Sequence, residues 1–324
     1  MKKEDLRIVY MGTPDFAVES LRALVEGGYN IVGVVTMPDK PMGRHGSVLQ
    51  SSPVKKYAES VGLPLLQPEK LKSEEFLAAL RELRADLQIV VAFRMLPEIV
   101  WNMPRLGTFN LHASLLPQYR GAAPINWAVI NGDEETGVTT FFLTHEIDTG
   151  KIIRQKRLPI ADTDDVETVH DALMHIGAEL VVETVDLLLD DKVEAIPQEE
   201  FYEDLADLRP APKIFKDTCR IDWNLPVKRV YDFIRGLSPY PAAWTELIGT
   251  DGKGQMLKIY QSEKRFEKHT LDVGTICSDK KSYIDIAVAD GFIRLLSLQL
   301  AGKKRMSVAD FLNGNKQITD CCVR

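Results

Sequence analysis

Short apolar runs alternate with helix-forming segments from Leu6 to Leu189, and no other feature of the sequence constrains the fold as strongly. The run LQIVVAF at residues 87–93 is apolar at nearly every position, which is typical of a parallel strand buried on both faces. Apolar residues between Val169 and Leu188 instead recur at steps of three and four, as in an amphipathic helix. We therefore predict an α/β fold with a doubly wound, mostly parallel, Rossmann-like sheet. The expected elements are strands at residues 6–12, 31–36, 87–93, 108–113 and 137–144, and helices at residues 15–26, 53–61, 73–84 and from Val166 onward.

The pattern changes near Arg209, where the proline-rich segment RPAPKIF begins. One helix-like stretch, residues 227–237, follows, together with short strand candidates that are separated by Gly, Asp and Lys. Short strands at regular spacing indicate a small barrel or sandwich, and we predict an OB-like β-barrel. The expected domains are residues 1–208 and residues 209–324, and the strand candidates are residues 256–263, 272–277, 283–289 and 292–300.

The charge is divided unevenly between these two parts. Residues 1–208 contain 20 Lys and Arg against 34 Asp and Glu, and residues 209–324 contain 20 against 13. The net charges are therefore −14 and +7, within a total of −7. Such asymmetry suggests a basic module that meets a polyanion, attached to an acidic body with another task. A solvated basic surface without a partner is the alternative, because charge alone is not a motif.

The composition disfavours several classes of protein. The amino-terminal segment carries lysines but no long apolar run, so we expect no secretory signal, and no apolar stretch reaches the roughly 20 residues that span a bilayer. The four cysteines show no CxxC spacing, which disfavours a zinc site or a disulfide framework. We expect a monomeric, cytoplasmic protein that binds neither a metal nor a membrane.

Three polar residues in the stretch 108–151 could carry chemistry. Asn110 and His112 stand two apart on a predicted strand, so their side chains share one face near the carboxyl end of that strand. The turn IDTG at residues 147–150 offers the carboxylate of Asp148. A histidine exchanges protons near neutral pH, an amide NH₂ stabilises an oxyanion, and a carboxylate supports the charged histidine. Acyl transfer between two nitrogens needs these parts, although Asn-x-His alone is more often a structural pair.

The run NLHASLLPQYRGAAPINWAVINGDEETGVT, followed by IDTG, resembles the signature of folate-dependent formyltransferases. Further similar segments extend the resemblance over nearly the full chain and indicate the branch of that family that acts on charged tRNA. These segments are MGTPDFA, PDKPMGR, SPVK, RIDW and LLSLQLAGKKRMS. The last two lie in a C-terminal domain of a kind that the smaller purine-pathway formyltransferase lacks. The resemblance therefore implies a formyltransferase with an added C-terminal tRNA-binding domain.

The resemblance also implies roles for individual residues. The family's catalytic set falls on Asn110, His112 and Asp148. The donor is 10-formyltetrahydrofolate, the acceptor is the α-amine of methionine on initiator tRNA, and no metal takes part. Arg94 departs from the family, which often has a Tyr-Gly followed by aliphatic residues here, so Arg94 could pair with the glutamate tail of folate or only with local carboxylates. The implied folate-binding residues are Ser114, Leu115, Leu116, Pro117, Phe93 and Arg94.

Two segments are candidates for contact with tRNA. Residues 36–52 are rich in Gly, Pro and Ser and predict a long loop. In the family this loop wedges against the acceptor end of the tRNA, which assigns tRNA contact to Arg44. The residues that follow, HGSVLQSS, hold fewer lysines than the family pattern, so we expect a weaker grip on phosphate. The second candidate is the basic run Lys303, Lys304 and Arg305, with a solvated turn as its alternative.

Two other functions fit parts of the sequence. A formyltransferase of the same fold could act on a small amine or a sugar nucleotide, but the basic C-terminal segment and the loop at residues 36–52 argue against it. A non-catalytic RNA-binding relative would not need Asn110, His112 and Asp148 intact. We expect direct transfer and not a formyl-enzyme, because no serine or cysteine lies in an obvious nucleophile motif.

Overall fold

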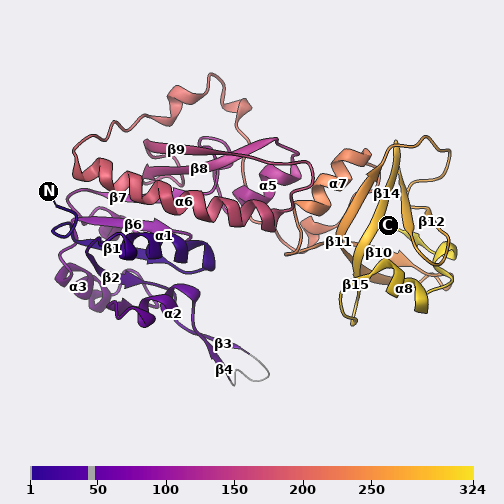
Figure 1. Ribbon diagram of the computed structural model, residues 1–324, viewed down its shortest axis with the longest axis horizontal. Helices are drawn as coiled ribbons and strands as arrows, with labels where there is room; N and C mark the ends of the chain where they lie inside the picture. The colour runs from indigo at the N-terminus through magenta and orange to yellow at the C-terminus, as the bar shows by residue number, and fades with distance from the viewer. Residues whose placement is uncertain (1, 43–47) are drawn as a thin grey trace. The chain divides into compact units, whose positions relative to one another are not determined.

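The computed structural model describes residues 2–42 and 48–324, and these residues fold into two compact units (Figure 1). Each unit is assembled from three segments of the chain, and the last segment of the second unit begins at Ala211. The predicted division into functional domains at residues 208 and 209 stays a prediction. The first unit contains Met1–Gly121, Gly137–Leu158 and His170–Pro210, and the second contains Ala122–Thr136, Pro159–Val169 and Ala211–Arg324.

The first unit is built around a sheet with the strand order β5-β2-β1-β6-β7-β8-β9. From β5 to β7 the neighbouring strands are parallel, and Val90 of β6 lies beside Asn110 of β7. β8 runs antiparallel to β7. The prediction of a mostly parallel α/β sheet is confirmed. The strands are β1 (Ile8–Gly12), β2 (Ile31–Val35), β5 (Leu65–Leu66), β6 (Leu87–Val91), β7 (Thr108–His112), β8 (Glu135–Phe142) and β9 (Ile152–Pro159).

Helices cover both faces of this sheet, as a doubly wound fold requires. On one face α6 packs against β7 and β8, so closely that a Cβ on Gly177 would lie 2.9 Å from Leu111. The hydroxyls of Thr140 on β8 and Thr184 on α6 are 2.8 Å apart. On the other face a buried apolar cluster joins β1 and β6 to α3 and α4. The helices are α1 (Asp15–Glu26), α2 (Pro53–Ser60), α3 (Glu74–Glu82), α4 (Glu98–Trp101) and α6 (Val166–Leu189), and the 3₁₀ turns are η2 (Gln198–Phe201) and η3 (Leu205–Asp207).

The segment predicted as a long loop, residues 36–52, contains a short antiparallel ladder. β3 (Lys40–Met42) pairs with β4 (Val48–Gln50). Lys40, Pro41, Leu49 and Gln50 of this ladder are exposed, and the sequence lacks the apolar periodicity that predicts strands. Residues 43–47 between the two strands, with Arg44 among them, lie outside the described residues.

The second unit is a nearly closed antiparallel barrel, which confirms the prediction of a small barrel. Its strand order is β12-β13-β14-β11-β10-β16, and β15 pairs with β14. The two ends of this order meet where Thr275, just before β12, forms a bridge with Cys322 of β16. The elements are α5 (Pro124–Ile130), η4 (Asp217–Cys219), α7 (Val227–Arg235), β10 (Ala243–Ile248), β11 (Gly254–Arg265), β12 (Ile276–Ser278), β13 (Ile284–Val288), β14 (Gly291–Leu300), β15 (Met306–Ser307), α8 (Val308–Gly314), η5 (Ile318–Asp320) and β16 (Cys322–Val323).

Residues from earlier in the chain complete this second unit. α5 packs against α7, and the side-chain amide of Asn126 donates to the carbonyl of Gly236 at 2.8 Å. Arg235 is buried on α7 and donates to the carbonyl of Asp164 at 2.7 Å. Because these bonds satisfy buried polar groups, the barrel unit depends on residues that precede its C-terminal segment.

Candidate active site

The candidate site lies at the carboxyl end of β7, where the pairing changes from parallel to antiparallel. The register places Asn110 between Val90 of β6 and Phe141 of β8, and it places His112 beside Thr139 of β8. Because side chains alternate along a strand, Asn110 and His112 point to the same face of the sheet. Open α/β sheets bind their ligands at this end of their strands. The structure places both residues as expected, and their catalytic roles stay predictions.

His112 is buried, with 6% of its surface exposed, and its ring is held in place. The ring nitrogen Nε2 lies 2.8 Å from the carbonyl oxygen of Tyr119. A carbonyl can only accept, so Nε2 carries a hydrogen and donates it. Phe141 packs edge-to-face with the imidazole, with ring centroids 6.4 Å apart. Proton exchange is therefore left to the other ring nitrogen, Nδ1.

Asp148 lies in the turn between β8 and β9 and approaches that nitrogen. Its Oδ2 is 3.8 Å from Nδ1 of His112, within ion-pair distance but longer than a direct hydrogen bond. The same oxygen accepts a hydrogen bond from the backbone N–H of Gly121 at 3.0 Å. Asp148 has a φ of 56°, in the left-handed region that residues other than glycine adopt infrequently. The turn thus holds the carboxylate beside the histidine in a backbone conformation that needs support from its surroundings.

The side-chain amide of Asn110 is available to a ligand. Asn110 is partly exposed, and no described residue forms a hydrogen bond with its side chain. Its NH₂ group can therefore donate to an oxygen that gains negative charge in a reaction, a task that suits a donor fixed on a strand. Together the three side chains offer a proton-exchanging nitrogen, a carboxylate that supports its charged form and a donor for an oxyanion.

The segment Ser114, Leu115, Leu116 and Pro117 follows directly after β7. The side chains of Ser114, Leu116 and Pro117 are buried, and that of Leu115 is partly exposed. The hydroxyl of Ser114 donates to the carbonyl of Gln118 at 2.6 Å, so it is used within the turn. Contact of this segment with folate stays a prediction, and we expect it to involve the Leu115 side chain and backbone groups.

Phe93 and Arg94 follow β6 and are both partly exposed. The guanidinium lies 5.6 Å from the centroid of the Phe93 ring and donates to the carbonyls of Glu69, at 2.8 Å, and Pro68. Burial lowers the pKa of Arg94. Among the described residues no carboxylate pairs with Arg94, and backbone carbonyls accept from its terminal nitrogens. Binding of folate by Phe93 and Arg94 stays a prediction.

Among the residues assigned to tRNA, Arg44 is outside the described part of the chain. Lys303, Lys304 and Arg305 form an exposed turn between β14 and β15. Arg305 lies 4.4 Å from the centroid of the Tyr260 ring, which fixes its side chain. No ion pair joins Lys303 or Lys304 to a described acidic residue, so both ammonium groups can meet a phosphate.

The backbone groups that hold the histidine and the aspartate were not predicted from the sequence. The carbonyl of Tyr119 fixes the ring of His112, and the N–H of Gly121 fixes the carboxylate of Asp148. Backbone groups are the same in every residue, so their contacts leave no signature in residue type. The only available signal was that QYRG follows the Asn-x-His pair within a few residues.

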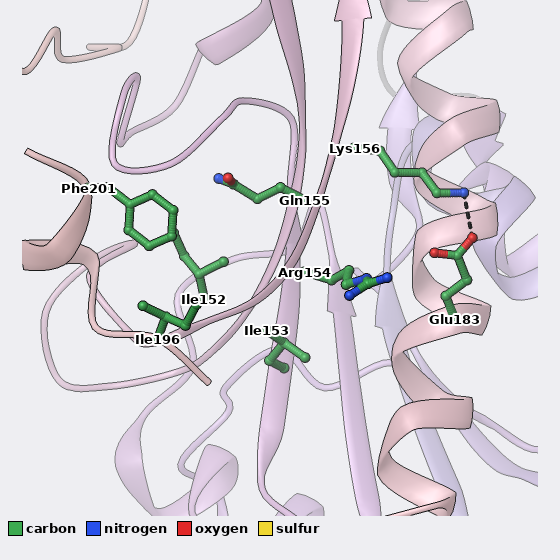
Figure 2. Close-up of a pocket in the computed structure, with 8 residues that line it drawn as sticks. All are labelled: Ile152, Ile153, Arg154, Gln155, Lys156, Glu183, Ile196 and Phe201. Atoms are coloured by element: carbon green, nitrogen blue, oxygen red, sulfur yellow. Dashed lines mark ion pairs between the residues drawn. The ribbon is translucent and has the colours of Figure 1, made fainter. Parts of the chain in front are cut away.

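A cavity of about 400 Å³ adjoins the turn that carries Asp148. A second cavity, of about 360 Å³, lies against β9 (Figure 2). There Lys156 pairs with Glu183 of α6 at 2.7 Å, and Gln155 points to the opposite side of the strand. The first cavity, which is the better place for part of a substrate, is lined by Arg120, Thr144, His145, Glu146, Thr149, Glu199, Tyr202 and Leu205. The second is lined by Ile152, Ile153, Arg154, Gln155, Lys156, Glu183, Ile196 and Phe201, none of them a candidate catalytic residue.

In the described part of the chain, no helix is both long and apolar enough to cross a membrane. Within residues 2–42 and 48–324, no three His, Cys, Asp or Glu side chains gather as metal ligands would. The cysteines Cys219, Cys277, Cys321 and Cys322 are free thiols.

Fold and site together define a class of protein. A histidine that can exchange a proton through one nitrogen, a carboxylate beside it and an unengaged amide meet at the ligand-binding end of an open α/β sheet. A set of this kind serves transfer of an acyl group between substrates, with the amide donor placed for the oxyanion. The chain is an enzyme of the acyl-transfer class.

More particularly, the chain belongs to the formyl transferase family. Residues 6–185 match the formyl transferase family, and residues 213–316 match its C-terminal domain. A protein of Parabacteroides distasonis named methionyl-tRNA formyltransferase is 82% identical over 100% of both chains. Proteins with the same name from Bacteroides fragilis and Porphyromonas gingivalis are 71% and 54% identical, over 97% of this chain and 96% and 97% of theirs. The transferred group is therefore a one-carbon formyl group.

Solved structures agree with this fold at low sequence identity. HypX from Aquifex aeolicus, in complex with tetrahydrofolic acid, matches 96% of this chain with a TM-score of 0.63 and 17% identity, over 47% of its own length. WlaRD, a sugar 3N-formyl transferase solved with dTDP and 5-N-formyl-tetrahydrofolate, matches 92% of this chain and 99% of its own, with a TM-score of 0.62 and 18% identity. At such identities the likeness shows a shared fold.

Proposed function

We propose that this enzyme transfers the formyl group of 10-formyltetrahydrofolate to the α-amine of methionine on initiator tRNA, for the start of translation in the cytoplasm. The observation that carries the proposal is the 82% identity, over the full length of both chains, with a protein named methionyl-tRNA formyltransferase. The match of residues 213–316 to a formyl transferase C-terminal domain adds support, because that segment is part of the basic region of the chain.

The three candidate residues divide the proposed reaction between them. The amine nitrogen bonds to the formyl carbon, the carbon–nitrogen bond to the folate breaks, and the folate nitrogen gains a proton as the amine loses one. Nδ1 of His112 takes the proton from the attacking amine, since Nε2 is engaged with Tyr119. Asp148 stabilises the imidazolium that forms, and the Asn110 amide donates to the oxyanion of the tetrahedral intermediate.

The site residues fit a reduced folate. A flat pterin needs apolar walls and a few polar contacts. Phe93 and Leu115 present partly exposed apolar side chains close in sequence to the ends of β6 and β7. Ser114, Leu116 and Pro117 are buried and shape the turn that presents Leu115. We propose that these segments contact the folate and that Arg94 lies at the border of its site.

The tRNA is held by positive charge in our proposal. Lys303 and Lys304 contact the RNA backbone, and Arg305 shapes their turn by its contact with Tyr260. We propose that Arg44 contacts the acceptor end of the docked tRNA. We also propose that the enzyme works as a monomer.

A sugar amine is the competing acceptor, because the sugar 3N-formyl transferase WlaRD shares the fold. Its 18% identity with this chain stands against 54–82% for the relatives named methionyl-tRNA formyltransferase. The decisive experiment gives the purified protein 10-formyltetrahydrofolate with charged initiator tRNA, uncharged initiator tRNA, free methionine or a dTDP-linked amino sugar. We expect formylation of charged tRNA at a kcat/KM at least about 100-fold above every other acceptor. Faster formylation of the amino sugar would overturn the proposal.

A further inference from the structure

Gln198 is a buried residue more than forty positions from any candidate catalytic residue, yet its side chain is tied to the active-site turns. It is 0% exposed. Its Nε2 donates to the backbone carbonyls of Asp148 and Gly150, each at 2.8 Å. Its Oε1 accepts from Nε and Nη2 of Arg120, at 3.0 and 2.7 Å. An amide group has two N–H donors and two acceptor positions, so all four are used.

These four bonds join the two turns that hold the catalytic pair. Arg120 lies between Tyr119, whose carbonyl fixes His112, and Gly121, whose N–H fixes Asp148. Through its Nε2, Gln198 also donates a hydrogen bond to the backbone carbonyl of Asp148. The Gln198 side chain thus links the turn that holds the His112 imidazole to the turn that carries the Asp148 carboxylate.

The backbone of the Asp148 turn needs hydrogen bonds that stabilise its conformation. The φ of 56° at Asp148 is an unfavourable conformation that persists only when neighbouring groups fix it. The gap of 3.8 Å between Asp148 and His112 holds no direct hydrogen bond that would keep the carboxylate in place. The Gly121 bond fixes the carboxylate, and the two bonds from Gln198 fix the backbone on which it stands.

The segment around Gln198 is itself anchored. Ile196 pairs with Ile152 of β9 through two backbone hydrogen bonds of 2.8 Å. Further along, the side chain of Gln118 donates to the carbonyl of Asp207 at 3.0 Å and accepts from the N–H of Arg209 at 2.8 Å. Residues 196–209 therefore form a strap fastened at both ends, and Gln198 is held where it can fix the turns.

We propose that Gln198 is a positioning residue for formyl transfer, which sets the placement of the Asp148 carboxylate against His112 through its bonds to the Asp148 turn and to Arg120. The inference rests on the proposed catalytic roles of His112 and Asp148. It assigns to Gln198 a contribution to turnover and none to the binding of folate or tRNA.

The test is a double-mutant cycle in the full chain. Gln198→Met removes all four bonds at nearly constant length, and Gln198→Glu keeps the acceptors for Arg120 but removes both donors to the Asp148 turn. We expect each to lower kcat by about tenfold or more, because small displacements of catalytic groups have large effects on rate. The KM for charged tRNA and the Kd for folate should stay within about twofold. In an Asp148→Asn background, Gln198→Met should lower kcat by no more than about twofold further.

The matched control is Gln88→Met, on β6. Gln88 is also 0% exposed, and its side chain accepts from Thr108 at 3.1 Å, at the opposite end of the strands from His112. This variant should keep its kcat. The inference is overturned if Gln198→Glu retains kcat, or if Gln198→Met lowers kcat by the same factor with and without Asp148. If Asp148→Asn alone leaves kcat unchanged, the proposed role of Asp148 fails first, and the inference falls with it.

Discussion

The position of one hydrogen decides what His112 can do. Because Nε2 is committed to the Tyr119 carbonyl, the imidazole gains and loses its second proton only at Nδ1, the nitrogen that faces Asp148. His112→Ala removes the proton acceptor, and Asp148→Asn removes the charge that stabilises the imidazolium. We expect each to lower kcat by about 100-fold or more in the tRNA formylation assay while the fold stays intact.

The control for this prediction is His175→Ala. His175 is exposed on α6, and its loss should leave kcat as it is. Near-normal turnover of either active-site variant would remove that residue from the mechanism.

The sequence could indicate the side chains of the site but not the contacts that hold them. Two residues apart on a strand must share a face, so the relation of Asn110 to His112 follows from local geometry. Nothing local relates Gln198 to Asp148, since their contact depends on how the strap closes over the turn. Residue type predicts chemistry, and burial and long-range hydrogen bonding need the folded chain.

At the scale of the element, a buried carboxylate on α7 is paired with two basic side chains of the same helix. The carboxylate of Asp232 is 1% exposed and accepts from Lys228 Nζ, at 2.5 Å, and from Arg235 Nε, at 2.8 Å. Asp232→Ala would leave the buried Arg235 without its counter-ion. We expect a loss of about 3–5 kcal/mol in the free energy of unfolding, measured by urea denaturation.

Asp272→Ala, which removes an exposed carboxyl from the same unit, should change the free energy of unfolding by less than about 0.5 kcal/mol. Equal stability of the two variants would show that the Asp232 cluster contributes no net stabilisation.

A long helix with a repeating apolar face was predicted, and two short or polar pairings were not. Val169 to Leu188 repeat with helical spacing, and α6 forms there. β9, with the sequence IIRQKRLP, lies at the end of the strand order and has charged residues in place of a continuous apolar run. β3 and β4 pair within a segment rich in Gly, Pro and Ser. In both cases hydrogen bonds between backbones form the strand, and the sequence shows no alternation of apolar residues that would predict it.

For the whole molecule, the net charge differs in sign between the segment proposed to catalyse formyl transfer and the segment proposed to bind tRNA. Residues 1–208 carry −14 and residues 209–324 carry +7, so a polyanionic substrate is attracted mainly by the C-terminal part. Lys303 and Lys304 are exposed there and have no described acidic partner. The double variant Lys303→Glu with Lys304→Glu should weaken the binding of initiator tRNA at least about tenfold. It should also reduce the slope of log Kd against log salt by about one to two. Folate affinity, measured by a separate titration, should stay the same.

A control with the same change in net charge distinguishes a local contact from a general effect of charge. Lys72→Glu with Arg81→Glu alters two exposed cations in the first unit and shifts the net charge equally. If the turn at Lys303 and Lys304 touches the RNA backbone, the control should lose clearly less affinity than the double variant, and its salt slope should stay near that of the unaltered protein. Equal losses in the two variants would mean that tRNA responds to the net charge of the enzyme, and the contact assigned to Lys303 and Lys304 would have to be abandoned.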